Sequence, residues 1–321
     1  MGARHAGTVG VMRYLELDLP KRVSKIGLGT WQFGSREWGY DRRYAEVEAG
    51  RIVGRALELG VTLFDTAEIY GLGRSERILG AALAGQREEV FLATKLFPLL
   101  PLAPIVQQRG VASAQRLRVR RLDLYQVHQP NPLVREQTTM RGMRALQDVG
   151  LVGEVGVSNY SLARWRRAES TLGRPVVSNQ VRYSLIDRRP ERDLIAYAEQ
   201  RGRVVIAYSP LAQGFLAGRY SAANRPRNPV RRHSKLFRPA SFAGAEQLLG
   251  TLEEIARAND ATPGQVALAW TIRHPNVVAI PGASSVAQLE QNAAAAELEL
   301  AAAEIQALDS AAGFSTAGQR R

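Results

Sequence analysis

The chain has 321 residues, of which 45% are hydrophobic and 23% charged, and its formal net charge is +13. These fractions are ordinary for a globular protein and argue against a disordered chain. There is no cysteine, which excludes disulfides, thiolate metal sites and cysteine nucleophiles. Because no apolar run is long enough for a membrane span or a signal peptide, we expect a soluble cytoplasmic protein without a membrane partner.

The positive charge comes almost entirely from arginine, with a local cluster at Arg116, Arg118, Arg120 and Arg121. Clustered cations can bind nucleic-acid phosphates. Here the arginines are spread over many segments and are not interleaved with aromatic residues in one tract. We therefore expect solvated surface charge that also attracts small anions, and no nucleic-acid partner.

Short runs rich in Val, Ile and Leu alternate with helical patterns, which is typical of buried parallel strands. The predicted strands lie at about 23–31, 62–67, 90–95, 122–128, 152–159, 176–181, 203–209 and 277–282. Strand–helix units of this spacing, eight in all, predict an α/β fold that is a single-domain (β/α)8 TIM barrel. An open doubly wound sheet is the alternative, but no GxGxxG follows the first strand.

Ser161, Thr262 and Ser285 are predicted to cap helices, the last two within capping boxes. The longest irregular stretch, at about 212–242, follows the seventh strand and is rich in arginine between 219 and 238. A loop of that length is usually functional, although a tolerated insertion is the alternative.

The active site of an α/β barrel lies at the C-terminal ends of its strands. Asp65 lies near the end of the second predicted strand, Tyr70 in the loop after it, and Lys95 and His128 end the third and fourth. Each has a structural alternative, such as capping or packing. Because Lys95 ends a run that we expect to be buried, its ammonium needs a carboxylate, which Asp65 on the neighbouring strand can supply.

These four residue types predict proton transfer. The pKa of tyrosine is about 10, and a neighbouring ammonium lowers it, so Lys95 would make Tyr70 a usable general acid. Asp65 would hold Lys95, and His128 would donate a hydrogen bond to the substrate oxygen. We expect no metal site because no HExxH spacing is present, and no serine hydrolase because no GxSxG is present.

Several motifs in order resemble the aldo-keto reductase family over about 14–311: FDTAEIYGLGRSERILG (64–80), ATK (93–95), LDLYQVHQP (122–130), GEVGVSNY (153–160), SNQVRYS (178–184), IAYSPLAQGFLAGRY (206–220) and IPGASSVAQLEQN (280–292). The resemblance implies a barrel domain at 14–321, with its long loop at about 212–242, after an N-terminal extension at 1–13 that we expect to be flexible. It also implies that Asp65, Tyr70, Lys95 and His128 form a catalytic tetrad for the reduction of an aldehyde or ketone by NAD(P)H. Histidine at position 128, where a variant of the family carries glutamate, favours carbonyl over alkene reduction.

The resemblance further implies that Ser158, Asn159 and Gln180 bind the nicotinamide carboxamide and that Tyr208 stacks on its ring. The other implied cofactor residues are Ser209, Pro210, Leu211, Gln213, Gly214, Arg219, Gly282, Ser284, Gln288, Gln291 and Asn292. The last motif lacks the basic residue with which many members bind the 2′-phosphate of NADP. Its Ser/Gln form resembles the NADP-binding β-subunits of voltage-gated potassium channels, so we expect NADP(H), with NAD(H) as the alternative.

The predicted substrate wall consists of Trp31, Phe33, Trp38 and Phe97 together with the loop LFPLLPLAP at 96–104, with core packing as the alternative for each aromatic residue. We expect a small-molecule carbonyl substrate and a monomer or weak homo-oligomer. Two other functions remain open. One is a cofactor-sensing partner protein resembling the channel β-subunits, and the other is a barrel enzyme in which Lys95 forms a Schiff base.

Overall fold

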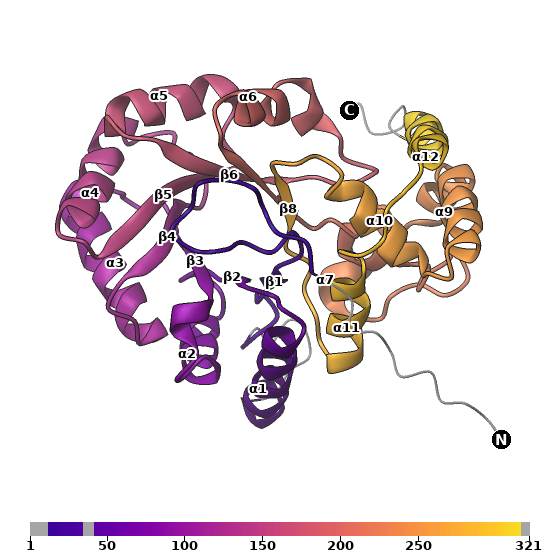
Figure 1. Cartoon of the computed structure of the whole chain (residues 1–321), viewed down its shortest axis with the longest axis horizontal. Helices are drawn as coiled ribbons and strands as arrows, with labels where there is room; N and C mark the ends of the chain where they lie inside the picture. The colour runs from indigo at the N-terminus through magenta and orange to yellow at the C-terminus, as the bar shows by residue number, and fades with distance from the viewer. Residues whose placement is uncertain (1–11, 35–41, 316–321) are drawn as a thin grey trace.

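The protein, seen here as a computed structural model, is described over residues 12–34 and 42–315. Parallel strands lie side by side in chain order from β1 to β8 (Figure 1). Their bounds are β1 Leu28–Gly29, β2 Leu63–Asp65, β3 Phe91–Leu96, β4 Leu122–Val127, β5 Val152–Ser158, β6 Val176–Arg182, β7 Val204–Tyr208 and β8 Val277–Ala279. Parallel bridges pair Ile26 with Ala279 and Gly29 with Gly282. The first and last strands are thereby joined, and the curled sheet has the arrangement of a (β/α)8 barrel.

Glycine is required where the two ends of the sheet meet. A Cβ atom on Gly29 would lie 2.7 Å from the carbonyl oxygen of Ile280. The backbone of β1 can therefore approach β8 closely enough for pairing only without a side chain at this position.

Helices follow the strands and surround the ring (Figure 1). The helices that follow β1 to β6 are α1 Arg42–Glu58, α2 Arg74–Ala82, α3 Ala103–Leu117, α4 Glu136–Asp148, α5 Leu162–Leu172 and α6 Leu194–Gln200. Helix α10 Pro263–Thr271 precedes β8, and α11 Val286–Ala294 follows it. Outside this ring, α9 Glu246–Ala258 packs on α10 and on α12 Ala302–Ser315. A short 3-10 turn, η2 Arg87–Glu89, lies between α2 and β3, and another, η3 Arg189–Arg192, lies between β6 and α6.

Each predicted strand overlaps an observed one, but the first was predicted too long. Val23 and Ser24 belong to a hairpin instead: Tyr14 forms an antiparallel bridge with Ser24, and the N–H of Leu15 donates to the Val23 carbonyl at 2.8 Å. Residues 1–11 of the predicted extension lie outside the described residues. Met12 is buried, and Arg13 donates to the Ala296 carbonyl, so these two residues pack on the barrel.

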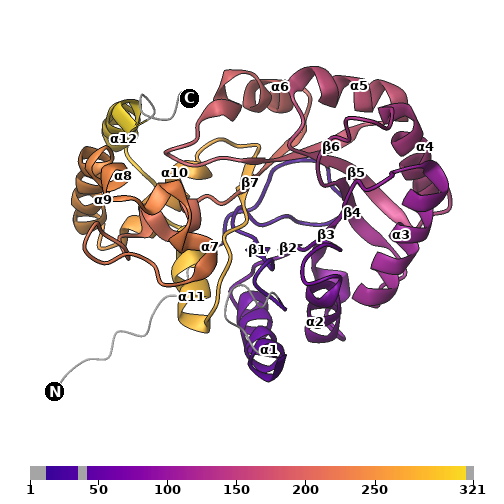
Figure 2. The ribbon, with the colours of Figure 1, turned by 180° about the vertical axis from the view of Figure 1, so that it is seen from behind.

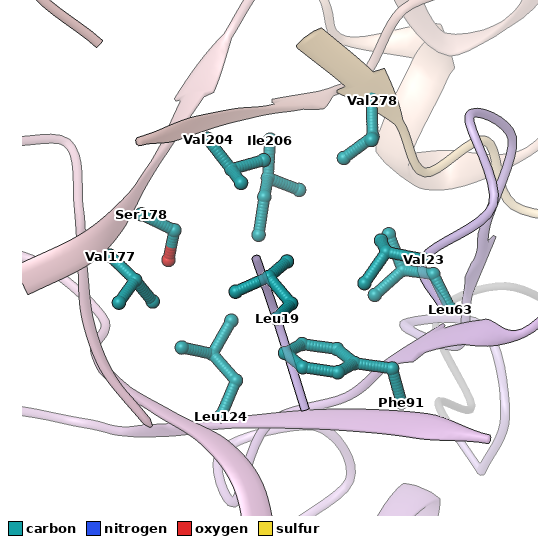
Figure 3. Close-up of a pocket in the computed structure, with 10 residues that line it drawn as sticks. All are labelled: Leu19, Val23, Leu63, Phe91, Leu124, Val177, Ser178, Val204, Ile206 and Val278. Atoms are coloured by element: carbon teal, nitrogen blue, oxygen red, sulfur yellow. The ribbon is translucent and has the colours of Figure 1, made fainter. Parts of the chain in front are cut away.

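The hairpin, residues 14–24, closes the N-terminal end of the barrel. It crosses the ring in Figure 1 and lies behind the strands in Figure 2. Leu19 lies at the centre of the view in Figure 3, among side chains that the strands direct inward, including Leu63, Phe91 and Val278. These residues belong to an inner apolar cluster that is separate from the larger core between the strands and the helices.

The side chains that the strands direct into the barrel are apolar at one end of the interior and polar at the other. In β3, Phe91 and Ala93 belong to the inner cluster, and Lys95 follows in the same phase. In β2, Leu63 belongs to the inner cluster, and Asp65, two residues later, points to the same side of the strand. Because side chains alternate with a period of two, the interior is apolar near the hairpin and polar at the C-terminal ends of the strands.

The long stretch at 212–242, predicted to be irregular, contains short helices: η4 Ala212–Ala217, α7 Pro229–Arg232, η5 Lys235–Phe237 and α8 Pro239–Ala243. Phe215, Phe237 and Phe242 pack against one another and order it. The capping predictions at Ser161 and Thr262 are confirmed. Ser285 also caps its helix, but Gln288 accepts from the N–H of Ser284 rather than completing the box.

Within the described ranges, no helix combines the length and apolar character needed to cross a bilayer.

The space around two helical glycines, Gly80 in α2 and Gly54 in α1, predicts opposite effects of alanine substitution on stability. A Cβ atom on Gly80 would lie 2.6 Å from the Leu117 carbonyl oxygen, whereas one on Gly54 in α1 would meet nothing within 4 Å. Gly80→Ala should lower the free energy of unfolding by about 1–3 kcal/mol through overpacking. Gly54→Ala should raise it by about 0.5–1 kcal/mol because alanine favours the helix. Urea unfolding of both variants measures this, and equal effects would contradict the packing described.

Candidate active site

The four residues predicted from strand ends meet at the polar end of the barrel. Asp65 ends β2, Lys95 is the second-last residue of β3, and His128 follows β4 directly. Tyr70 lies in the turn after β2, where its N–H donates to the Ala67 carbonyl at 3.1 Å. The parallel register brings these positions to one edge of the sheet, as expected for an α/β barrel.

The Lys95 ammonium is fully buried and has three acceptors. It donates to Asp65 Oδ1 at 2.5 Å, to the Thr66 carbonyl at 2.9 Å and to the Tyr70 hydroxyl oxygen at 3.3 Å. Burial lowers the pKa of Lys95, but the charge of Asp65 and the contacts with Asp65 and Tyr70 outweigh it, so the pKa is raised. Lys95 is therefore a permanently charged group at neutral pH.

The direction of the Tyr70 pKa differs from the prediction. Burial of the phenol raises the pKa of Tyr70, and this effect outweighs the lowering by the Lys95 ammonium. The negative charge of Asp65 adds to the increase. Tyr70 thus carries its proton at neutral pH, and the sequence argument considered the ammonium without the cost of burial.

His128 is neutral in this setting. Burial, together with the nearby Lys95 charge, lowers its pKa from 6.5 to about 3. Its ring meets those of Tyr70 and Phe97 edge-on, with centroid distances of 5.8 and 6.2 Å. The buried Nδ1 of His128 has no hydrogen-bond partner. A neutral imidazole beside the Tyr70 ring can serve as a hydrogen-bonding group without competing as an acid.

The second carboxylate oxygen of Asp65 is held by two glutamines. Gln180 Nε2 donates to Asp65 Oδ2 at 2.8 Å, and Gln126 Nε2 lies 3.4 Å from the same atom. We predicted that Gln180 binds a nicotinamide carboxamide, and here its amide also supports the tetrad. The sequence analysis did not identify Gln126. Its position two residues before His128 places it on the same face of the strand, which could have indicated that it lies in the site.

A layer of buried ion pairs supports the Tyr70 loop. Glu76, fully buried, accepts from Thr94 at 2.6 Å and pairs with Arg116 at 2.5 Å. Glu68 pairs with Arg109 at 2.7 Å and accepts from the backbone N–H of Phe97. Arg116, which we expected to be solvated surface charge, is instead the partner of a buried carboxylate.

The residues predicted to bind the nicotinamide form a chain of contacts at the ends of β5, β6 and β7. The Tyr208 hydroxyl donates to Asn159 Oδ1 at 2.9 Å, and Asn159 Nδ2 donates to the His128 carbonyl at 3.2 Å. Ser158 Oγ donates to the Gln180 carbonyl at 2.8 Å. These side chains therefore border the tetrad directly.

The remaining predicted cofactor residues lie after β7 and β8. Pro210 is buried, Leu211 is half-buried, and Ser209, Gln213 and Gly214 have positive φ angles of 51°, 59° and 93°. Gln213 Oε1 is buried without a partner, and Arg219 is exposed. At the start of α11 the Ser284 hydroxyl donates to Gln288 at 2.6 Å, Asn292 donates to the Gly282 carbonyl at 3.3 Å, and Gln291 is exposed.

Two of the predicted substrate residues lie beside the tetrad. The ring centroid of Trp31 is 6.2 Å from that of Tyr70, and Phe97 contacts His128 as described above. Phe33 is buried in the outer core, which supports the packing alternative for that residue. Trp38 lies outside the described residues.

Comparison with known proteins agrees with this arrangement. The model of the aldo/keto reductase family matches residues 25–312. The chain belongs to the aldo/keto reductase family. This oxidoreductase is 58% identical over 301 residues to an uncharacterized oxidoreductase of Mycobacterium tuberculosis, covering 94% of this chain and 93% of that protein.

More distant members are also similar. The methylglyoxal reductase of Escherichia coli is 36% identical, with 89% of this chain and 90% of that protein covered. The crystal structure of an aldo-keto reductase from Klebsiella pneumoniae in complex with NADPH has a TM-score of 0.75 at 30% identity, covering 94% of this chain and 95% of that one.

The buried pair predicts a specific stability test. Asp65→Asn leaves the fully buried Lys95 without its counter-charge, so the free energy of unfolding should fall by about 3–5 kcal/mol. Adding Lys95→Met removes the orphaned charge and should recover most of that loss. Denaturant unfolding of the two variants and the parent measures both steps. If Asp65→Asn alone were as stable as the parent, Asp65 would not be the group that balances the charge of Lys95.

Proposed function

We propose that the chain reduces an aldehyde or ketone with NADP(H), with Tyr70 as the proton donor. The observation that carries this proposal is the contact between the Tyr70 hydroxyl and the buried Lys95 ammonium, which Asp65 holds in turn. A protonated phenol next to a fixed positive charge is suited to give up its proton as negative charge develops on a substrate oxygen.

In the proposed reaction the substrate carbonyl oxygen accepts hydrogen bonds from Tyr70 and His128. Tyr70 transfers its proton to that oxygen, and the Lys95 ammonium stabilises the phenolate that remains. His128, neutral because its pKa is about 3, orients the carbonyl without adding charge. The nicotinamide, when bound, supplies hydride from its C4 to the carbonyl carbon.

The residues around the tetrad fit a nicotinamide cofactor. The side-chain amides of Asn159 and Gln180 can hydrogen-bond a carboxamide, and the half-buried Tyr208 presents a ring for stacking. Gln213 provides a buried oxygen without a partner. The NADPH complex of the Klebsiella pneumoniae relative supports NADP(H) as the cofactor. We assign Arg219 to its phosphates because 280–292 contains no basic residue.

The geometry argues against the two other functions. Schiff-base formation needs a neutral, accessible amine. Lys95 is fully buried, donates to three acceptors and has a raised pKa. A protein that only senses its cofactor has no need of a protonated phenol held by that ammonium, so the complete tetrad favours turnover.

Tyr70→Phe should lower kcat for a test aldehyde such as 4-nitrobenzaldehyde by about 10²–10⁴-fold, because the proton donor is lost while the ring remains. NADPH binding, followed by quenching of intrinsic fluorescence, should be preserved. Tyr125→Phe is the matched control: its buried hydroxyl has no hydrogen-bond partner, so activity should be retained.

Unchanged turnover in Tyr70→Phe would remove this residue from its proposed role. The parent protein is assayed with both NADPH and NADH, and a clear preference for NADH would overturn the cofactor assignment.

The shifted pKa values also predict the pH profile of reduction. The raised pKa of Tyr70 keeps the donor protonated, so kcat/KM should fall only as pH rises through that value, above pH 10. His128, with a pKa of about 3, stays neutral from pH 5 to 8 and should add no step there. Initial rates measured from pH 5 to above pH 10 give the profile. A transition near pH 6.5 that disappears in His128→Gln would contradict the neutral histidine.

A further inference from the structure

Exposed apolar side chains are concentrated on one half of the catalytic face. Of the ten large apolar side chains exposed in the described part of the chain, seven lie in the loops after β1 to β4. Leu72, Leu99, Leu100 and Leu133 are the most exposed of them, at 82, 66, 58 and 89%. The other half, after β5 to β8, carries the polar cofactor residues. The loops of the apolar half follow the same strands, β2, β3 and β4, from which the tetrad comes.

The loop after β3 presents this apolar surface in a fixed conformation. Residues 96–102 read LFPLLPL, without a polar side chain. Asn131 Nδ2 donates to the Pro98 carbonyl at 2.8 Å, and Arg109 donates to the Leu99 carbonyl at 3.2 Å. The backbone is thus tied on both sides, while the leucine side chains are left in solvent. The loop begins at Phe97, which contacts His128.

Two of these leucines also have unfavourable backbone angles. Leu72 and Leu100 have φ angles of 54° and 47°, in the left-handed region that favours glycine and asparagine. Of the eight described non-glycine residues with positive φ, six follow strands on the catalytic face. An exposed leucine gains little from packing, and at this φ it strains the backbone. Its side chain is therefore better explained by contact with a ligand than by stability.

We infer that the substrate carries an apolar chain or ring of several carbons beyond its carbonyl, and that Leu100 and Leu99 determine this specificity. The inference rests on the proposed carbonyl reduction and adds its substrate class. With the carbonyl at Tyr70 and His128, the remainder of the molecule passes Phe97 and reaches the leucines of the loop. A sugar or another polyhydroxylated carbonyl compound would leave its hydroxyl groups against this surface without partners.

The test compares straight-chain aldehydes from propanal to octanal with glyceraldehyde, using NADPH. Each methylene that leaves water should raise kcat/KM roughly threefold, mainly by lowering KM. Glyceraldehyde should be a poorer substrate than propanal. If kcat/KM did not change with chain length, or if glyceraldehyde were preferred, the inference would be overturned while carbonyl reduction would stand. If the parent protein reduces none of these aldehydes, the proposed function falls and the inference with it.

Leu100→Asn then tests the residue itself, because asparagine accepts a left-handed backbone but is polar. The ratio of kcat/KM for octanal to that for propanal should fall by about fivefold, and the thermal midpoint should not decrease. Leu99→Asn should act in the same direction, without the backbone effect. Val149→Asn is the control: Val149 is 77% exposed and ends α4 at the opposite end of the barrel, so the ratio should not change. An unchanged ratio in both leucine variants would overturn their role.

Discussion

The site depends on one buried charge pair. A fully buried ammonium is tolerated only with a carboxylate and further acceptors around it, and Lys95 has Asp65, the Thr66 carbonyl and the Tyr70 hydroxyl. Asp65 in turn needs donors for its second oxygen, which Gln180 and Gln126 provide. Satisfying one cation therefore joins the ends of β2, β3, β4 and β6. The positions of these side chains are therefore fixed by the need to pair a buried charge.

The same interior explains why the candidate active site lies at one end of the barrel. The hairpin fills the N-terminal end mainly with apolar side chains: Leu19 lies among Leu63, Phe91 and Val278, and Ser178 is the polar member of the described lining. At the other end, the inward positions continue in phase as Asp65, Lys95 and Gln180. Polarity thus changes along a single strand, such as from Phe91 to Lys95. Lys95 of the candidate tetrad and the core residue Phe91 are therefore four positions apart in β3.

This periodicity is why much of the fold and site could be predicted from sequence. Asp65, Lys95 and His128 end apolar runs, and the rule for barrel active sites collects them on one face. Other features depend on neighbours that no local pattern identifies. The hairpin that shortens β1 packs against residues distant in the sequence, such as Val278, and the contact of Gln126 with Asp65 joins residues 61 positions apart.

Energetic properties were harder to predict than positions. The pKa of Tyr70 is set by the balance between burial and a nearby ammonium, and the sequence indicates the second but not the first. Arg116 looked like one member of a solvated basic cluster, yet it compensates Glu76, which is completely buried. Glu76 is the third residue of α2, and the local sequence does not show that its side chain faces the neighbouring helix.

The hairpin that closes the barrel also has a consequence for the order of folding. Its residues, 14–24, are synthesised long before packing partners such as Val278 in β8 and Ile280 just after it. The inner cluster therefore cannot be completed until nearly the whole chain has been synthesised. Contacts of such sequence separation are costly to close and slow folding. During synthesis the leucines of the hairpin are left without native partners, which makes the nascent chain a candidate for chaperone binding.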